Sequence, residues 1–306
     1  MRKDIERFLE AANEIVLGKE HEVRLALVCL MARGHLLIED RPGVGKTTLA
    51  HTLAQLLGLD FQRIQFTSDL LPADIVGATV YDRESGRFRL HQGPIFSSLV
   101  LADEVNRATP KCQSALLEAM GERQVSIEGE TRPLPDPFFV IATQNPDSQL
   151  GTFPLPESQL DRFLMRLSMG YPDSGAEREL LRGEDRSTLL RRLGQPALSP
   201  DQLRKLQDQV PKVHVSEALL DYLQALIRHT RECGHFRHGL SPRAGLALLR
   251  TAQAWALSHG RAAVLPEDVQ AVFLPVATHR LEPKDDTAFE ARDELVREIL
   301  GQVSIP

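Results

Sequence analysis

The amino-acid sequence predicts an α/β fold, in which a parallel sheet flanked by helices is followed by a small all-helical domain. In the first half of the chain, short apolar runs typical of buried strands alternate with helical patterns. Beyond residue 172 the strand-like runs stop, and helix start signals replace them. We therefore predict an α/β core over residues 1–172 and a helical domain over residues 173–306.

Composition narrows the class of protein. The chain has 306 residues, of which 42% are hydrophobic and 25% charged, as in ordinary globular proteins. A net charge of -6 gives no general basic surface for nucleic acid. The longest apolar run, residues 25–32, is too short to span a bilayer, and the first residues lack the hydrophobic segment of a signal peptide. Three cysteines form no paired framework, so we expect a cytoplasmic protein.

The N-terminal elements lead to a glycine-rich turn. Residues 4–33 carry two helical patterns, separated at residues 16–19 where a glycine interrupts the periodicity. Residues 36–38 form an apolar strand-like run, which is followed by a Pro/Gly turn and a helix that ends at Gly58. Residues 61–66 then alternate apolar and polar side chains, as a half-exposed strand does.

The glycine turn has the parts of a phosphate-binding loop. Backbone N–H groups at the start of the helix can converge on a polyphosphate, Lys46 can reach its β and γ phosphates, and the Thr47 hydroxyl can bind Mg²⁺. Asp40 stands where the strict pattern G-x-x-x-x-G-K-[ST] has its first glycine, and the alternative is an ordinary strand-to-helix turn. The nucleotide-binding residues expected in this loop are Gly43, Val44, Gly45, Lys46, Thr47 and Thr48.

Polar residues follow two further predicted strands. Residues 99–102 are an apolar run that ends in Asp103 and Glu104, and residues 138–142 are another that leads to Asn145. The carboxyl ends of parallel strands meet at the edge where ligands bind. There Asp103 could hold Mg²⁺, Glu104 could deprotonate an attacking water, and Asn145 could hold that water or the γ phosphate. The alternatives are surface acids at a strand end and an amide that starts a turn.

Two hairpins and a set of capped helices complete the prediction. We expect hairpins near residues 79–90 and 122–134, the first with a charged tip. In the second half, helices are predicted to begin at Ser199, Ser216, Ser241 and Pro266.

Two groups of residues in the helical half could bind ligands. Arg243 would lie in the first turn of its helix, where a cation opposes the helix dipole, so an external anion is its expected partner; the alternative is a plain exposed arginine. Cys233, His235 and His238 have spacings that metal ligands can have, but a fourth ligand is missing and the segment is typical of a loop.

Several long stretches together resemble the MoxR family of AAA+ ATPases. The resemblance covers almost the whole chain and is densest over residues 36–171. The matching stretches are residues 65–77 (QFTSDLLPADIVG), 93–96 (GPIF), 101–120 (LADEVNRATPKCQSALLEAM), 138–146 (FFVIATQNP), 154–163 (PLPESQLDRF) and 241–244 (SPRA).

The resemblance implies a role for each matching residue. Lys46 and Thr47 match the Walker A pair, Asp103 and Glu104 match the Walker B pair, and Asn145 matches sensor 1. The fold class that it implies is an AAA+ P-loop core with a parallel five-stranded sheet, followed by a small helical lid.

Residues outside the phosphate loop also acquire roles from the resemblance. Arg243 matches sensor 2 and joins Lys46 in neutralising the nucleotide. Arg162 matches the arginine finger given to the neighbouring subunit, although Arg166 could compete for that role. Val16 and Gly18 fall where such proteins form part of the wall around the base.

The resemblance also implies a function. It implies ATP and Mg²⁺ as ligands, a homo-oligomeric ring that is most plausibly a hexamer, and chaperone-like remodelling or maturation of partner proteins, which in this family often carry von Willebrand A domains. Both hairpins resemble insertions that face the ring pore. One alternative, a helicase-like DNA motor, is permitted by the hairpins but disfavoured by the acidic balance. The other, a nucleotide-gated scaffold with little turnover, would have no need of a water-aligning carboxylate at Glu104.

Overall fold

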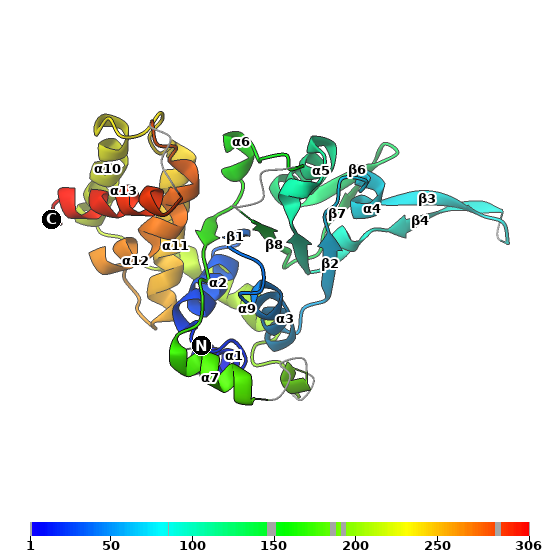
Figure 1. Cartoon of the computed structure of the whole chain (residues 1–306), viewed down its shortest axis with the longest axis horizontal. Coiled ribbons are helices and arrows are strands. Elements are labelled where there is room, and N and C mark those ends of the chain that lie inside the picture. The colour runs from blue at the N-terminus through cyan, green and yellow to red at the C-terminus, as the bar shows by residue number, and fades with distance from the viewer. Residues whose placement is uncertain are drawn as a thin grey trace.

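A parallel five-stranded sheet lies at the centre of the first half of the chain (Figure 1). The computed structural model describes residues 2–84, 86–145, 151–183, 188–190, 194–284 and 289–305. The strands of the sheet are β1 (Leu36–Glu39), β2 (Phe61–Gln65), β5 (Leu99–Asp103), β8 (Phe139–Gln144) and β9 (Met165–Leu167). Their spatial order is β2-β5-β8-β1-β9, and every neighbouring pair is parallel.

The strand order determines where the polar strand ends meet. Leu36 of β1 is in register with Ile141 of β8 on one side and with Met165 of β9 on the other. Because all five strands run the same way, the residues that follow β1, β5 and β8 lie at one edge of the sheet, and those that precede β1 and β9 lie at the opposite edge.

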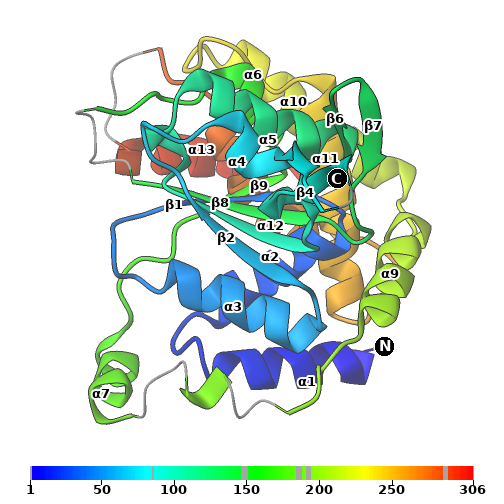
Figure 2. The ribbon, with the colours of Figure 1, turned by 90° about the vertical axis from the view of Figure 1, so that its right-hand side faces the viewer.

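Helices cover both faces of this sheet (Figure 2). Leu36 and Ile38 belong to one core cluster and Leu37 to another, as the alternation of side chains along a strand requires. One face is covered by α1 (Arg2–Asn13), α2 (Glu20–Met31) and α3 (Lys46–Leu57), and the other by α4 (Pro72–Val76) and α5 (Pro110–Glu122). The short helices are η1 (Pro94–Phe96), η2 (Val105–Arg107), α6 (Glu157–Leu160), η3 (Val210–Lys212) and η4 (Thr278–Arg280).

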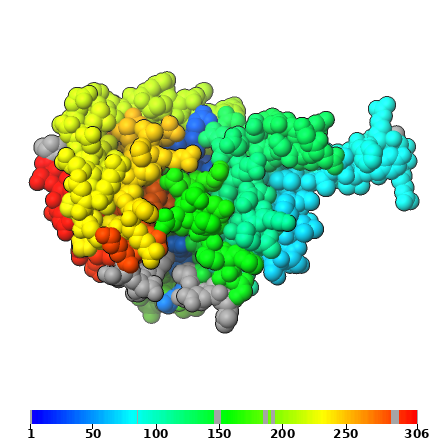
Figure 3. All heavy atoms as spheres, turned by 90° about the horizontal axis from the view of Figure 1, so that it is seen from above, coloured from blue at the N-terminus to red at the C-terminus, as the bar shows by residue number. Residues whose placement is uncertain are grey.

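Two hairpins lie where the sequence predicts them. They are formed by β3 (Gly77–Asp82) with β4 (Arg87–Gln92) and by β6 (Gln124–Ile127) with β7 (Glu130–Pro133). The β3–β4 hairpin projects far from the body of the molecule (Figures 1 and 3). Near its tip, the rings of Tyr81 and Phe88 contact each other edge-on, and Phe88 is 72% exposed.

The second half of the described chain is helical. Its longer helices are α7 (Ser174–Arg182), α9 (Pro200–Gln209), α10 (Glu217–Glu232), α11 (Pro242–Ser258), α12 (Pro266–Ala277) and α13 (Phe289–Gln302). The hydroxyls of Ser199, Ser216 and Ser241 each accept a hydrogen bond from the backbone amide three residues ahead, so all three predicted serine caps are confirmed.

The helical half is not set apart as one unit. Helices α10 to α13 form a group beside the sheet (Figure 1), whereas α9 packs against the core. The Leu198 amide donates to the Leu56 carbonyl over 3.0 Å, and Gln207 Nε2 donates to the Leu30 carbonyl over 2.9 Å. The boundary after residue 172 therefore stays a prediction. No helix in the described parts of the chain has the length and apolarity to cross a bilayer.

Candidate functional site: a phosphate cavity and a separate arginine-lined cavity

A cavity of about 370 Å³ opens at the start of α3, at the carboxyl edge of the sheet. Gly45, which immediately precedes α3, has a left-handed backbone (φ 94°) that disfavours a side chain there. The N-terminus of a 12-residue helix, with its unpaired N–H groups, attracts anions. The residues that line the cavity are Pro42, Gly43, Gly45, Lys46, Thr47, Thr48, Arg63, Asp103, Glu104 and Asn145.

Lys46 is one of two cations that line this cavity, the other being Arg63. Its Nζ donates a hydrogen bond to the backbone carbonyl of Asp40. Partial burial lowers the pKa of Lys46, while the nearby carboxylates of Asp40, Asp103 and Glu104 act in the opposite direction. The ammonium group therefore lies close to the helix N-terminus, where a bound polyphosphate could replace the Asp40 carbonyl as its partner.

Asp103 is held by two side chains from neighbouring strands. Thr143 Oγ1 donates to Asp103 Oδ1 over 2.5 Å, and Arg63 Nη2 lies 2.5 Å from Asp103 Oδ2. Carboxylate and hydroxyl oxygens suit Mg²⁺, and Asp103 lines the same cavity as Thr47, so the donors fit this ion. Arg63 and Thr143 could not be predicted as site residues from the sequence, because their contacts with Asp103 depend on which strands are neighbours.

Glu104 differs from Asp103 in its backbone and in its partners. It follows β5 with a left-handed backbone (φ 57°), and its amide donates to Thr143 Oγ1 over 2.9 Å. Its carboxylate accepts from Gln65 Nε2 over 3.2 Å and lies 3.1 Å from Arg107 Nε. Thr143 thus contacts both acidic residues, and Asn145 reaches the same cavity from the end of β8.

Arg162 and Arg243 line a different cavity, of about 340 Å³. This cavity is bordered by Gly34 and His35 before β1 and by Leu164 before β9, so it lies at the amino edge of the sheet. Arg123, Arg250 and Arg280 line it too.

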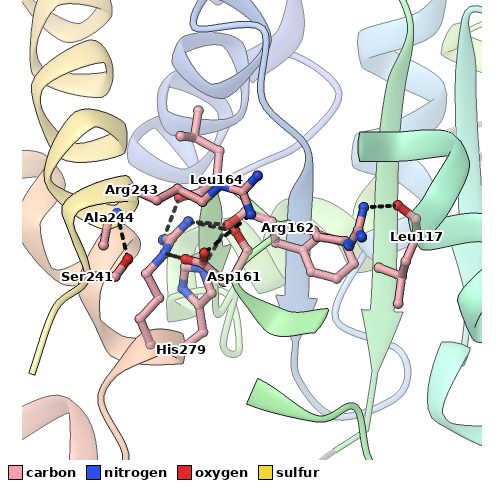
Figure 4. Close-up of polar contacts among 10 residues, drawn as sticks. Leu117, Asp161, Arg162, Leu164, Ser241, Arg243, Ala244 and His279 are labelled. Atoms are coloured by element: carbon pink, nitrogen blue, oxygen red, sulfur yellow. Dashed lines mark hydrogen bonds and ion pairs between the residues drawn. The ribbon is translucent and has the colours of Figure 1, made fainter. Parts of the chain in front are cut away.

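The two arginines are held in place there (Figure 4). Arg162 Nη1 donates to the Leu117 carbonyl over 2.9 Å, and the largely exposed Arg243 lies 3.7 Å from the Asp161 carboxylate. Contrary to the expectation from sequence, Arg243 therefore lies outside the phosphate cavity of its own chain.

Arg166 is buried between the sheet and α13. Its guanidinium group pairs with Glu39 and with Asp293, the latter over 2.7 Å, and Gln144 Nε2 also donates to Glu39. These ion pairs hold the Arg166 side chain in the interior of the molecule, whereas the side chain of Arg162 is exposed. The competing assignment of Arg166 as the finger is therefore not supported.

Known proteins resemble this chain over nearly its whole length. The model of an ATPase family associated with various cellular activities (AAA) matches residues 35–165, and a model of an AAA lid domain matches residues 228–299. The chain is 40% identical to chaperone MoxR1 of Mycobacterium tuberculosis, covering 99% of this chain and 82% of the relative. It is 35% identical to protein MoxR of Paracoccus denitrificans, with 89% and 86% covered. The chain belongs to the MoxR family of AAA+ ATPases.

Two further matches extend the relationship. The uncharacterised protein YeaC of Bacillus subtilis is 43% identical over 97% of this MoxR-family chain and 93% of its own length. A crystal structure from Cytophaga hutchinsonii, of a protein proposed to be an ATPase, matches with a TM-score of 0.88 at 37% identity, covering 100% of this chain and 96% of that one. The predicted fold class is thereby confirmed.

The remaining predicted residues of this MoxR-family chain are not among those that line the phosphate cavity. Val16 and Val44 are buried in the core. Gly18 lies against the start of α7, where an added Cβ would be 2.9 Å from that of Ala176. Cys233, His235 and His238 do not form a metal site, since no group of three or more His, Cys, Asp or Glu residues suited to a metal occurs among the described residues.

Proposed function

We propose that this chain binds Mg-ATP in the phosphate cavity and hydrolyses it within a homo-oligomeric ring. The observation that carries the proposal is the convergence of Lys46, Asp103, Glu104 and Asn145 on one cavity at the N-terminus of α3. A bare phosphate-binding site would need the lysine and the helix end, but it would not need a half-buried carboxylate next to a metal-binding one.

Hydrolysis transfers the γ phosphoryl group to water. The water oxygen attacks the γ phosphorus, the bond to the β–γ bridging oxygen breaks, and Glu104 accepts the proton of the water. Lys46 contacts the phosphates, Thr47 and Asp103 hold Mg²⁺, and Asn145 orients the water. Bound Mg²⁺ supplies positive charge that neutralises the β and γ phosphates.

We assign Arg162 and Arg243 to the nucleotide of the neighbouring subunit. Their cavity precedes β1 and β9, whereas the phosphate cavity follows β1. Since a strand rises about 3.3 Å per residue, the four residues of β1 alone separate the two edges by about 13 Å. A head-to-tail ring joins two different surfaces of neighbouring subunits, and we assign these two edges to that contact. A finger in trans accelerates hydrolysis about 10³- to 10⁵-fold, which is about 4 to 7 kcal/mol.

The ring would act on other proteins. One relative is named a chaperone, and the β3–β4 hairpin presents exposed aromatic side chains far from the nucleotide. We propose a hexameric ring that remodels or matures partner proteins, including proteins with von Willebrand A domains. Residues 1–172 would form the nucleotide-binding core and residues 173–306 the lid. A cytoplasmic location is part of this proposal, since the cysteines are unpaired.

A mixing experiment tests the proposal. Arg162→Ala and Glu104→Gln subunits are each expected to be nearly inactive. In an equal mixture, a Glu104→Gln subunit can give its intact Arg162 to a neighbour that retains Glu104. Random mixing makes about a quarter of the interfaces complete, so we expect about a quarter of wild-type turnover. Arg228→Ala, an exposed arginine of α10 outside both cavities, is the matched control. A mixture without activity, with an active wild type and exchanging subunits, would show that Arg162 is not the trans finger.

A further inference from the structure

Asp40 stands at the position where the general phosphate-loop pattern has glycine, and it is 8% exposed. It is the first residue after β1, and its amide donates to the Gln144 carbonyl over 3.2 Å. A glycine could make that backbone contact equally well. The carboxylate of Asp40 is therefore the feature that calls for an explanation.

The carboxylate joins the phosphate loop to the segment that leaves the sheet. Asp40 Oδ2 accepts a hydrogen bond from the Gly170 amide over 2.6 Å and another from Ser168 Oγ over 3.1 Å. Asp40 Oδ1 accepts from the Arg41 amide over 2.7 Å. Such bonds to an ionised carboxylate are stronger than bonds between neutral groups. We call the contacts of Asp40 with Ser168 and Gly170 the Asp40 link.

The chain beside the Asp40 link contacts the phosphate loop and also Gly18, which the family resemblance places near the base. An added Cβ on Gly45 would lie 3.9 Å from Met169 Cε, so Met169 packs beside the phosphate loop. Lys19 Nζ donates to the Tyr171 carbonyl over 2.9 Å, and Gly18 lies against Asp173. The same segment leads directly into α7 and the helical half.

The Asp40 link is also connected to Lys46. The backbone carbonyl of Asp40 accepts the hydrogen bond of Lys46 Nζ. A polyphosphate that takes Lys46 as its partner therefore removes one contact from the residue that holds the segment at 168–170.

We propose that Asp40 is a positioning residue that transmits nucleotide binding from Lys46 to the segment 168–170, and through it to the helical domain. The inference rests on the proposed function, because the trigger is nucleotide in the phosphate cavity. On this proposal, the aspartate at the usual glycine position couples nucleotide binding to the helical domain and does not strengthen nucleotide binding. Removal of the carboxylate removes a negative charge from a site for a polyanion, so nucleotide binding should not weaken.

The test compares Asp40→Asn, Asp40→Gly and Ser168→Ala with the wild type. Asp40→Gly restores the general glycine pattern and removes the link, while Ser168→Ala removes one of its two hydrogen bonds. Hydrogen–deuterium exchange of residues 168–172 is measured with and without Mg-ADP, together with the Kd of Mg-ADP and kcat. In the wild type we expect nucleotide to change exchange in this segment.

In Asp40→Gly we expect the Gly170 amide to exchange faster and the response of the segment to Mg-ADP to be lost. Asp40→Asn, whose amide oxygen can still accept one hydrogen bond, should show a smaller change in the same direction. The Kd should be equal or lower, and kcat should fall about 2- to 30-fold, the usual range for a coupling residue. Ser168→Ala should show a smaller change in the same direction, and it serves as the test if the Asp40 variants fold poorly. If Asp40 only supported the fold, its loss would instead lower the stability of the protein and leave the response of the segment to Mg-ADP intact.

Two results would overturn the inference. One is an Asp40→Gly variant with the kcat and the exchange response of the wild type, which would make Asp40 a mere substitute for glycine. The other is unchanged exchange of the Gly170 amide in nucleotide-free Asp40→Gly, which has no side chain to accept its hydrogen bond and would show that the link does not hold the segment. If the wild type binds no Mg-ADP, the proposed function fails. The exchange of the Gly170 amide in nucleotide-free protein then still tests whether the Asp40 link holds the segment.

Discussion

At the scale of single residues, the two acids of the phosphate cavity are held differently. Asp103 accepts hydrogen bonds from Thr143 and Arg63 at 2.5 Å, whereas the contacts of the Glu104 carboxylate are longer than 3.0 Å. The better-held carboxylate suits a fixed metal ligand. The less constrained one suits a base that must accept and release a proton in every cycle.

The substitution Glu104→Gln should separate nucleotide binding from turnover. Glutamine keeps the size of the side chain but cannot accept the proton of the attacking water, so we expect kcat to fall about 10²- to 10⁴-fold with little change in the Kd of Mg-ATP. The measurement is phosphate release together with calorimetric binding. Glu118→Gln, on the exposed side of α5, is the matched control. Full turnover of Glu104→Gln would remove Glu104 from the mechanism.

The residues that could be predicted from sequence are those whose chemistry is local in the chain. Lys46 and Thr47 follow a glycine turn, and Asp103 and Glu104 end an apolar run. The residues next to each pair in the sequence are therefore enough to identify it. Arg63 could not be predicted in the same way. It is 40 residues from Asp103 and reaches it only because β2 pairs with β5, a neighbour relationship that no local pattern contains.

At the scale of elements, His35 connects β1 to its surroundings through its neutral ring. Its Nδ1 accepts a hydrogen bond from the Val140 amide over 3.0 Å, and its Nε2 donates to the Met120 carbonyl over 3.2 Å. A protonated ring could not accept from the amide. Burial accordingly lowers the pKa of His35 to about 4.

Acidification should therefore destabilise the fold through His35. Between pH 6.5 and 4 the unfolded chain binds a proton at His35 that the folded protein does not, so the free energy of unfolding falls as the pH falls. From pH 7 to pH 5 we expect the wild type to lose about 2 kcal/mol more than His35→Gln, which has no titrating ring. Urea unfolding at both pH values measures the difference. Equal losses in the two proteins would show that His35 is not responsible.

The elements themselves were predictable where one physical signal dominates. Serine N-caps, two of them followed by proline, predicted the starts of α9, α10 and α11, and continuous apolar runs predicted β1, β5 and β8. The order of the strands was not predictable to the same degree, because it depends on packing between segments that are distant in the chain. The β3–β4 hairpin extends beyond its predicted ends for a related reason, since its last pair, Gly77 with Gln92, is fixed by the body of the protein.

At the scale of the whole molecule, the phosphate cavity and the arginine-lined cavity lie at opposite edges of one sheet. The serine cap predicted that Arg243 would lie in the first turn of α11, but it could not place α11 relative to the sheet. That placement follows from the packing of α11 on α2 and α12, and from contacts such as the ion pair of Arg243 with Asp161.

Arg243 should therefore act between subunits. We expect Arg243→Ala to lose most turnover, and an equal mixture with Glu104→Gln to recover about a quarter of the wild-type rate, because a complete site then forms between unlike neighbours. If Arg243 instead served its own chain, every site in the mixture would carry one defect and no activity would return. The steady-state rate of ATP hydrolysis against mixing ratio distinguishes the two arrangements.

The left-handed backbone of Glu104 affects which variants a laboratory screen for stable protein would select. A residue other than glycine with a left-handed backbone (φ 57°) costs about 1 to 3 kcal/mol. Glycine stabilises the unfolded chain by only about 0.4 to 1 kcal/mol, so Glu104→Gly should make the protein more resistant to heat. The same change removes the carboxylate that activates water. A laboratory screen that rewards only folded, abundant protein would therefore enrich inactive variants at this position. Only a requirement for turnover would keep the glutamate.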